Sequence, residues 1–243
     1  MDLANFDTKT VDAALNSQGY VILKDKGLKK KCEAARKEYE VCLKTLKVHA
    51  PSDKFDSRQL SRKPWRKLTI GGRNGNGDPI AQNLQTVYFD PSDKSYPGLG
   101  SLFHSMIVVR NALMAVDPDY GNDRERDGFW NACRVHHYPR GGGFMTMHRD
   151  EYFPGKLAEK DKPFYQMLVL LSRKGTDFIT GGGVLVSFEG KVIDVEREAG
   201  FGSMVLYDGR TEHGVEDVDL DQIIDFSRSD GRMAALVNLY CAV

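Results

Sequence analysis

The 243 residues of the chain are enough for one sizeable domain with a buried core and too few for two of ordinary size. Hydrophobic residues make up 41% of the chain and charged residues 28%, which is typical of a soluble globular protein. The 34 basic and 34 acidic residues cancel, so the overall charge provides no attraction to nucleic acid or to an anionic membrane.

The cysteines and the apolar runs limit the class of protein further. Cys32, Cys42, Cys133 and Cys241 are scattered without a C-x-x-C pair, so neither structural zinc nor a secreted disulfide scaffold is expected. No apolar run reaches the roughly 18 residues of a membrane span, and the first residues lack the pattern of a signal peptide. We therefore expect a cytoplasmic protein with no membrane partner.

The first half of the chain, to about residue 128, is predicted to consist mostly of helices and loops. Asp7 or Thr8 can cap a short helix that ends near Asn16, and an apolar run at residues 19–23 predicts a strand. Residues 26–48 carry apolar side chains three and four positions apart, which is typical of an amphipathic helix.

A segment without periodicity follows, and then a clear helix. Residues 50–98 are rich in Gly, Pro, Asn and Asp, so we predict long loops there, which in a compact domain are often functional. Helical spacing returns over residues 99–116, and Pro118 ends it.

The second half is a succession of short apolar strands separated by glycines. The predicted strands are residues 132–138, 144–148, 164–172, 183–188, 203–207, 213–215 and 232–240. Many short strands with turns between them predict a β-sandwich or barrel. Helices followed by strands predict an α+β fold. Because no repeat or linker interrupts the chain, we expect a single domain over residues 1–243. Residues 1–128 would supply helical support and substrate loops, and residues 129–243 the β core.

Two histidines and one aspartate have the spacing of a metal site. His148 and Asp150 form an H-x-D triplet at the end of a predicted strand, where residues two apart point the same way. His213 lies at the entry to a later strand. Two imidazoles and one carboxylate on one side of a metal form the facial triad of iron(II) oxygenases. An H-x-D triplet alone is also common as surface polarity, so the surrounding sequence has to decide.

Six segments of the second half agree with one family in order and spacing. The first is Tyr138-Pro-Arg-Gly-Gly-Gly-Phe-Met-Thr-Met-His148-Arg-Asp150, and the others are residues 164–172, 180–187, 202–208, 212–215 and 231–240. Together they resemble 2-oxoglutarate-dependent dioxygenases, in particular the prolyl-4-hydroxylase-like branch. The resemblance implies a double-stranded β-helix, which is a jelly-roll, cupin-like core, with N-terminal supporting helices.

The resemblance also implies roles for individual residues. His148, Asp150 and His213 would bind Fe(II), and O2 would take an open position on the metal. Arg232 opens the last strand, where the family places a basic residue that pairs with the far carboxylate of 2-oxoglutarate, and a guanidinium fork suits a carboxylate. The gap between His213 and Arg232 is longer than usual in the family, so Arg228 is a rival anchor. The acidic insertion at residues 216–230 is expected to be a solvated loop, with an active-site lid as the alternative.

Strand alternation places Arg134, His136 and Tyr138 on one face of the strand at residues 132–138. In similar enzymes this face looks into the barrel, so Tyr138 and Arg134 are candidate 2-oxoglutarate contacts. Arg134 and His136 could instead face the substrate, and His136 could be a satisfied core residue. Gln166 is a further co-substrate candidate. Leu170 stands where relatives often carry a polar residue.

A cluster of cations surrounds a tryptophan between residues 58 and 73. Trp65 and Arg66 are candidate substrate contacts, by stacking and by charge pairing, and Arg149 within the H-x-D triplet is a third. The alternative is a solvated charged face. The neutral chain makes a nucleic-acid partner unexpected.

The resemblance implies that iron(II), 2-oxoglutarate and O2 together hydroxylate an unactivated C–H bond, with succinate and carbon dioxide as co-products. Halogenating members of the superfamily have a small residue in place of Asp150, so halogenation is not expected. Desaturation or epoxidation would use the same ligands.

The substrate is less constrained than the reaction. Because no peptide, nucleic-acid or lipid module accompanies the core, we expect a small metabolite, such as an amino acid or specialised metabolite. One alternative is a prolyl or other protein side-chain hydroxylase, and another is a cupin-like metal-binding protein without turnover. A zinc hydrolase is a third, and it would need Glu212 or Glu151 as a general base.

Overall fold

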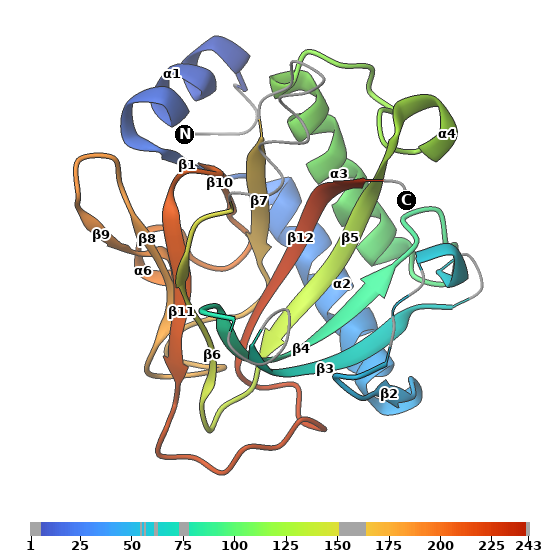
Figure 1. Ribbon diagram of the computed structural model, residues 1–243, viewed down its shortest axis with the longest axis vertical. Coiled ribbons are helices and arrows are strands. Elements are labelled where there is room, and N and C mark those ends of the chain that lie inside the picture. The colour runs from blue at the N-terminus through green and yellow to red at the C-terminus, as the bar shows by residue number, and fades with distance from the viewer. Residues whose placement is uncertain are drawn as a thin grey trace.

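A curled β-sheet with helices on its outer side makes up the molecule in Figure 1. The computed structural model describes residues 6–53, 55, 57–60, 63–72, 78–150 and 164–241. Its helices are α1 (Thr8–Gln18), α2 (Lys26–Thr45), α3 (Pro97–Leu113), α4 (Arg124–Asp127), α6 (Val195–Glu198) and the 3-10 turn η2 (Ser57–Gln59). Its strands are β1 (Tyr20–Leu23), β2 (Val48–His49), β3 (Trp65–Gly72), β4 (Ala81–Phe89), β5 (Phe129–Tyr138), β6 (Gly143–His148), β7 (Tyr165–Leu170), β8 (Gly182–Val186), β9 (Val192–Asp194), β10 (Met204–Asp208), β11 (Glu212–Val218) and β12 (Arg232–Cys241).

Aspartates start the two N-terminal helices. The Asp7 carboxylate accepts a hydrogen bond from the backbone N–H of Thr10, and the Asp25 carboxylate accepts one from the N–H of Leu28. Gly19 ends α1 in the left-handed conformation, with φ of 83°. Both predicted helices are confirmed, and α1 extends two residues beyond the predicted end.

The strands form two curled layers that share β4. The larger layer runs in the order β1-β10-β7-β12-β5-β4, with β3 and then β2 beyond β4, and the smaller layer runs in the order β6-β11-β8-β9. Gln82 and Asn83 of β4 pair with β6, whereas residues 85–89 pair with β5, so one strand links the layers. This antiparallel arrangement confirms the predicted jelly-roll core.

The prediction of long loops across residues 50–98 is wrong. Residues 65–72 and 81–89 of this segment form the antiparallel pair β3 and β4, which runs in register from Trp65↔Tyr88 to Gly72↔Ala81. The buried positions of β4 include the polar residues Gln82, Gln85 and Thr86, so no apolar alternation marks it as a strand. Pairing with β5 and β6, rather than local pattern, determines this strand. Sequence analysis also missed the short elements α4, β9 and α6.

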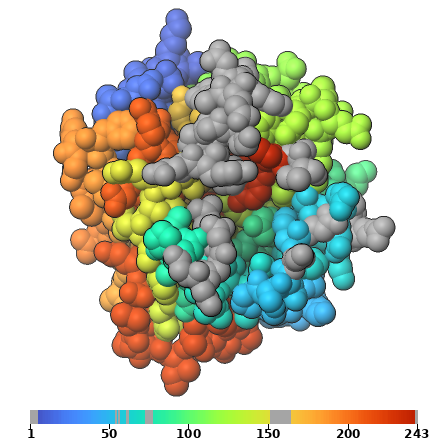
Figure 2. Space-filling view, viewed as in Figure 1, coloured from blue at the N-terminus to red at the C-terminus, as the bar shows by residue number. Residues whose placement is uncertain are grey.

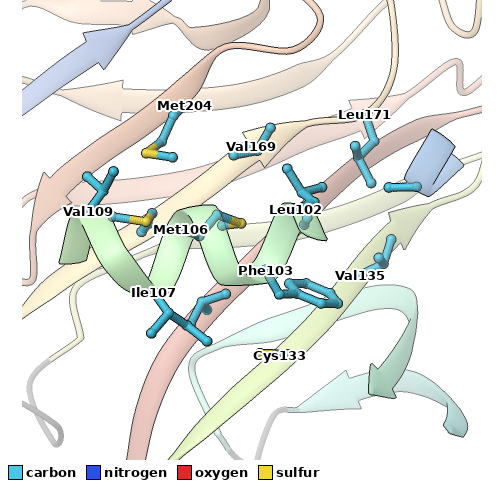
Figure 3. Close-up of a cluster of buried hydrophobic side chains, with 14 of the residues drawn as sticks. Leu102, Phe103, Met106, Ile107, Val109, Cys133, Val135, Val169, Leu171 and Met204 are labelled. Carbon is cyan, nitrogen blue, oxygen red and sulfur yellow. The ribbon is translucent and has the colours of Figure 1, made fainter. Parts of the chain in front are cut away.

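Helix α3 anchors the hydrophobic core on the outer side of the larger layer. Its Leu102, Phe103 and Met106 are completely buried and pack against apolar residues of β5, β7 and β10 (Figure 3). Burying a side chain of this size contributes about 1.5–3 kcal/mol relative to leaving it exposed. Among the described residues no helix is both long and apolar enough to cross a membrane.

A buried polar network lies on the same outer side, where α2 covers β3, β4 and β5. Arg66 donates to the Gln85 side chain at 2.9 Å and to the carbonyls of Leu43 and Phe226 at 2.6 and 2.7 Å. Gln85 in turn donates to Nδ1 of His137 at 2.9 Å.

The same network fixes the insertion at residues 216–230. His137 donates from Nε2 to the carbonyl of Asp230 at 2.8 Å, and its burial lowers the pKa to about 4. The carbonyl of Phe226 accepts from Arg66 and Gln85. The far half of the insertion is therefore tied to the outer side of the sheet, while residues 221–225 are exposed. This agrees with the expected solvated loop and not with a lid.

Candidate active site

A cavity of about 360 Å³ lies between the two layers. Both layers line it, and the hydrophobic part of its wall includes Leu168, Val205 and Leu236. In Figure 2 the dark red end of β12 is seen at the centre of the face, with yellow β6 to one side and the cyan segment of β3 to the other.

The three predicted metal ligands converge in this cavity. His148 on β6 and His213 on β11 are direct register partners, which places their rings side by side with centroids 4.2 Å apart. Asp150 follows β6 by two residues, and its Oδ2 lies 3.6 Å from Nε2 of His213. One ligand atom from each of the three residues lies within 4.8 Å of the others.

Backbone carbonyls orient both imidazoles toward the common point. Nδ1 of His148 lies 2.8 Å from the carbonyl of Thr146, and Nδ1 of His213 lies 3.0 Å from the carbonyl of Thr211. A carbonyl only accepts, so each Nδ1 carries the proton and each Nε2 offers a lone pair. Two such nitrogens and one carboxylate fit iron(II), and they leave coordination positions for a co-substrate and oxygen.

A chain of amides supports the Asp150 carboxylate. Gln166 on β7 donates from Nε2 to Oδ2 of Asp150, and Asn238 on β12 donates to the Gln166 carbonyl oxygen. Asp150 is buried, so this chain restrains a carboxylate that bulk water cannot reach freely. Gln166 was predicted as a 2-oxoglutarate contact. It lines the cavity, but its amide N–H is directed at Asp150.

Arg232 lies farther along the same cavity wall. Its side chain is buried, and its Nε donates to Glu196 at 2.7 Å. Burial lowers the pKa of Arg232, but the Glu196 carboxylate together with Tyr138 and Tyr207 more than offsets burial, so the pKa is raised. Glu196 also accepts from the N–H of Gly183 at 2.7 Å, and a Cβ at position 183 would approach Nη2 of Arg232 to 2.6 Å. The wall is therefore shaped around this guanidinium.

The rival anchor lies elsewhere. Arg228 is exposed and pairs with Asp230 at 2.7 Å, outside the cavity lining. Of the two arginines, the structure brings only Arg232 into the cavity with the triad.

Arg134, His136 and Tyr138 of β5 all face the cavity, as strand alternation predicted. Arg134 donates from Nε to Nε2 of His136 at 2.9 Å, and the Tyr138 hydroxyl lies 3.5 Å from Nδ1 of the same ring. The Tyr138 ring lies 5.3 Å from the guanidinium carbon of Arg232. The orientation of these residues is confirmed, and their roles remain predictions.

With this geometry established, comparison with known proteins becomes informative. No family model and no curated protein matches the chain. Among solved structures, a prolyl-4-hydroxylase from Pseudomonas putida matches with a TM-score of 0.53 and 15% identity over 98% of this chain and 100% of that one. A prolyl hydroxylase from Trichoplax adhaerens, in complex with a hypoxia inducible factor peptide fragment, matches with a TM-score of 0.55 and 16% identity. The match covers 96% of this chain and 89% of that one. An oxidoreductase of the 2OG-Fe(II) oxygenase family from Burkholderia pseudomallei matches with a TM-score of 0.50 and 14% identity. The match covers 97% of this chain and 91% of that one.

The chain has the fold of the 2OG-Fe(II) oxygenases. The resemblance found in the sequence is thus confirmed for the fold. In this oxygenase fold the triad and Arg232 lie in one cavity between the layers.

Three predicted substrate contacts lie outside the cavity. Trp65 stacks on His49, with ring centroids 3.5 Å apart, and does not line the cavity. Arg66 follows Trp65 on the strand, so it faces the outer side and belongs to the buried network there. Arg149 is more than half exposed and pairs with Glu212 at 3.3 Å.

The same pair bears on the zinc alternative. Glu212 points to Arg149 at the surface and does not line the cavity, so it is not placed as a general base. Glu151, the other predicted base, lies outside the described residues.

Sequence analysis missed three residues that shape the site. They are Glu196, Asn238 and Lys67, the last of which lines the cavity from β3. Glu196 lies in a charged four-residue helix and had no signal of its own, whereas Lys67 belongs to the cation cluster around Trp65 but was not singled out within it. Asn238 in an apolar strand was a possible signal, because a polar residue there needs a buried partner.

Proposed function

We propose that the chain is an iron(II)- and 2-oxoglutarate-dependent dioxygenase that hydroxylates a C–H bond of a small metabolite. The observation that carries the proposal is one cavity with a facial triad at one place and a buried arginine farther along the same wall. When bound, iron(II), 2-oxoglutarate and O2 supply the oxidant, with succinate and carbon dioxide as co-products.

Different residues of the chain would bind the metal, bind 2-oxoglutarate and exclude water. His148, Asp150 and His213 would hold the metal, and the backbone carbonyls behind the imidazoles keep the proton on Nδ1. Arg232 would hold the far carboxylate of 2-oxoglutarate, and Glu196 keeps the guanidinium in place. The hydrophobic wall around Leu168 excludes water from the cavity.

The size of the cavity supports a small substrate. About 360 Å³ lies at the lower end of the range for small-molecule sites, and the co-substrate would take part of that space. A protein side chain entering from outside is the competing substrate. If a proline-containing peptide stimulates 2-oxoglutarate turnover and small metabolites do not, the substrate assignment fails.

The proposal is tested by the visible spectrum of the anaerobic protein with iron(II) and 2-oxoglutarate. A weak metal-to-ligand charge-transfer band is expected in the wild type. His148→Ala should abolish it and Arg232→Ala should weaken it, because the first removes a metal ligand and the second a co-substrate contact. Arg228→Ala is the matched control and should leave it unchanged. No band in the wild type, together with no 2-oxoglutarate binding by calorimetry, would contradict the proposal.

A further inference from the structure

Arg134 is a buried cation that forms no salt bridge with a carboxylate among the described residues, although the Asp150 carboxylate is near enough to act on it electrostatically. Arg134 is 4% exposed, and its side chain donates hydrogen bonds to Nε2 of His136 at 2.9 Å and to the carbonyl of Ala132 at 3.2 Å. Within the described part of the chain no carboxylate lies at salt-bridge distance from it, and its Nη2 donates no hydrogen bond to a described residue. A buried charge without a partner is costly, so a bound anion is the natural complement.

The 2-oxoglutarate proposed above does not account for Arg134. Arg134 of β5 is the register partner of Leu236 of β12, and Arg232 of β12 is the register partner of Tyr138. The backbones of the two arginines are therefore four residues apart along the strand direction, roughly 13 Å. In the proposed function one carboxylate of 2-oxoglutarate pairs with Arg232 and the other binds the metal. Both anionic ends of the co-substrate are then used, and Arg134 is left for another ligand.

Lys67 adds a second cation on the same side of the cavity. The register pairs His136 with Thr86 and Thr86 with Lys67, so Lys67 lies two strands from His136 on the face that lines the cavity. Two strand spacings are about 10 Å, which two long side chains can bridge to reach one anion. Lys67 is half-buried, and among the described residues it has no acidic partner.

Aromatic rings hold this end of the cavity in shape. The guanidinium carbon of Arg134 lies 5.2 Å from the centroid of the Tyr240 ring, which restrains its plane together with the hydrogen bond to His136. Phe55 and Tyr88 stack with centroids 4.3 Å apart, and both line the cavity. A restrained guanidinium beside apolar rings suits a carboxylate with a carbon skeleton attached.

The charges of the cavity support an anionic substrate. Among the described residues, Arg134, Arg232 and Lys67 line the cavity as three positive groups, Asp150 lines it as a negative one, and Glu196 adds a second negative charge behind Arg232. Iron(II) would add two positive charges and 2-oxoglutarate two negative charges. One positive charge then remains, and a substrate with one carboxylate neutralises it.

We propose that Arg134 and Lys67 form a carboxylate-binding subsite, so that the substrate is a small carboxylic acid held by its anionic group with its carbon chain directed toward the triad. This inference rests on the proposed function and specifies its substrate class.

The test uses a panel of small monocarboxylic acids, each paired with its neutral primary amide, in an assay for substrate-stimulated succinate formation by the iron-loaded enzyme. At least one acid should stimulate turnover, and its amide should be at least 10-fold weaker. Arg134→Met, which keeps the side-chain volume, should raise the KM for that acid about 100-fold, because it removes a charge-assisted pair between the guanidinium and the carboxylate. Lys67→Met should raise it about 10-fold, and Arg228→Gln is the control outside the cavity.

Calorimetry and the charge-transfer band separate failure of this inference from failure of the proposed function. Arg134→Met should bind 2-oxoglutarate with an affinity close to that of the wild type. If it loses 2-oxoglutarate binding while folded, Arg134 is a co-substrate residue and the inference is overturned. If amides stimulate turnover as well as acids do, the inference is overturned and the proposed function stands. If Arg134→Met does not fold, Lys67→Met and the comparison of acids with amides decide. If the wild type gives no band and binds no 2-oxoglutarate, both fail.

Discussion

The two faces of β5 carry similar polar residue types, but the two faces differ in how far other protein groups satisfy those side chains. Arg134 and His136 face the cavity, whereas His137 faces the helices and belongs to a closed network with Gln85 and Arg66. On the helix side every one of these three polar side chains has protein partners, and the network holds the insertion in place. On the cavity side a buried guanidinium has no acidic partner among the described residues. Polar groups satisfied by the protein stabilise the fold, and groups left for a ligand define a site.

The largest expected effect comes from removing a metal ligand on the cavity side. His213→Ala should lower 2-oxoglutarate turnover at least about 1,000-fold, because the triad loses one of three ligands. The free energy of unfolding of the metal-free protein should change little, and succinate formation and urea denaturation measure the two quantities. Near-normal turnover in this variant would place the chemistry elsewhere.

His137→Leu on the helix side should have the opposite profile. It removes one of the two acceptors of the Gln85 amide and the His137 donor to the Asp230 carbonyl, at a cost of about 2–3 kcal/mol in the free energy of unfolding. Iron(II) affinity, measured by calorimetry, should stay near that of the wild type. A variant that loses iron binding but not stability would show that the faces are not separate in function.

The same histidine predicts a dependence of stability on pH. Burial lowers the pKa of His137 to about 4 in the folded protein, against about 6.5 in the unfolded chain. The unfolded chain therefore binds an extra proton between these values, so this contribution is complete above pH 6.5 and is lost as the pH falls toward 4. The loss is on the order of 3 kcal/mol. Urea denaturation across this range should show a steeper decline for the wild type than for His137→Leu, and equal slopes would contradict the assignment.

A smaller effect should follow from loosening the amide chain behind Asp150. Asn238→Ala removes the donor to Gln166 and should weaken iron(II) binding about 10- to 100-fold. Asn83→Ala is the matched control, because Asn83 donates to the carbonyl of Gly142 at 2.9 Å and does not line the cavity. Equal iron affinities for the two variants would mean that the chain does not restrain the ligand.

The smallest effect is expected at the surface. Arg149→Gln breaks an exposed pair with Glu212 and should change the free energy of unfolding by less than about 0.5 kcal/mol, with turnover unchanged. A drop in turnover of more than about 10-fold would return Arg149 to the set of substrate contacts that the sequence suggested.

Strand periodicity explains why the metal site could be predicted. Residues two apart on a strand share a face, so His148 and Asp150 were expected together, and β5 was expected to present Arg134, His136 and Tyr138 to one side. The pairing of β6 with β11 that brings His213 to His148 was implied by the resemblance to the oxygenases. Only the structure shows it.

The strand pairing of residues 65–89 and the orientation of their side chains could not be predicted from any local sequence pattern. The β3–β4 pair was missed because its buried positions carry glutamine and threonine, which pair with polar groups from other strands. Trp65 and Arg66 looked like a binding loop because the basic residues around them are close in sequence. The strand then turns Arg66 to the outer side and packs Trp65 on His49.

By itself the sequence determined the α+β class, the β-rich second half and the identity of the three candidate metal ligands. The class and the β-rich half follow from periodicities of two and of about 3.6 residues, and the ligands follow from the resemblance to the oxygenases together with the chemistry of imidazole and carboxylate groups. Tertiary structure alone decided that Arg228 stays outside the cavity, that Glu196 pairs with Arg232, and that no described carboxylate lies at salt-bridge distance from Arg134. The physical reason is that the partner of a buried charge is chosen by packing between segments far apart in the chain.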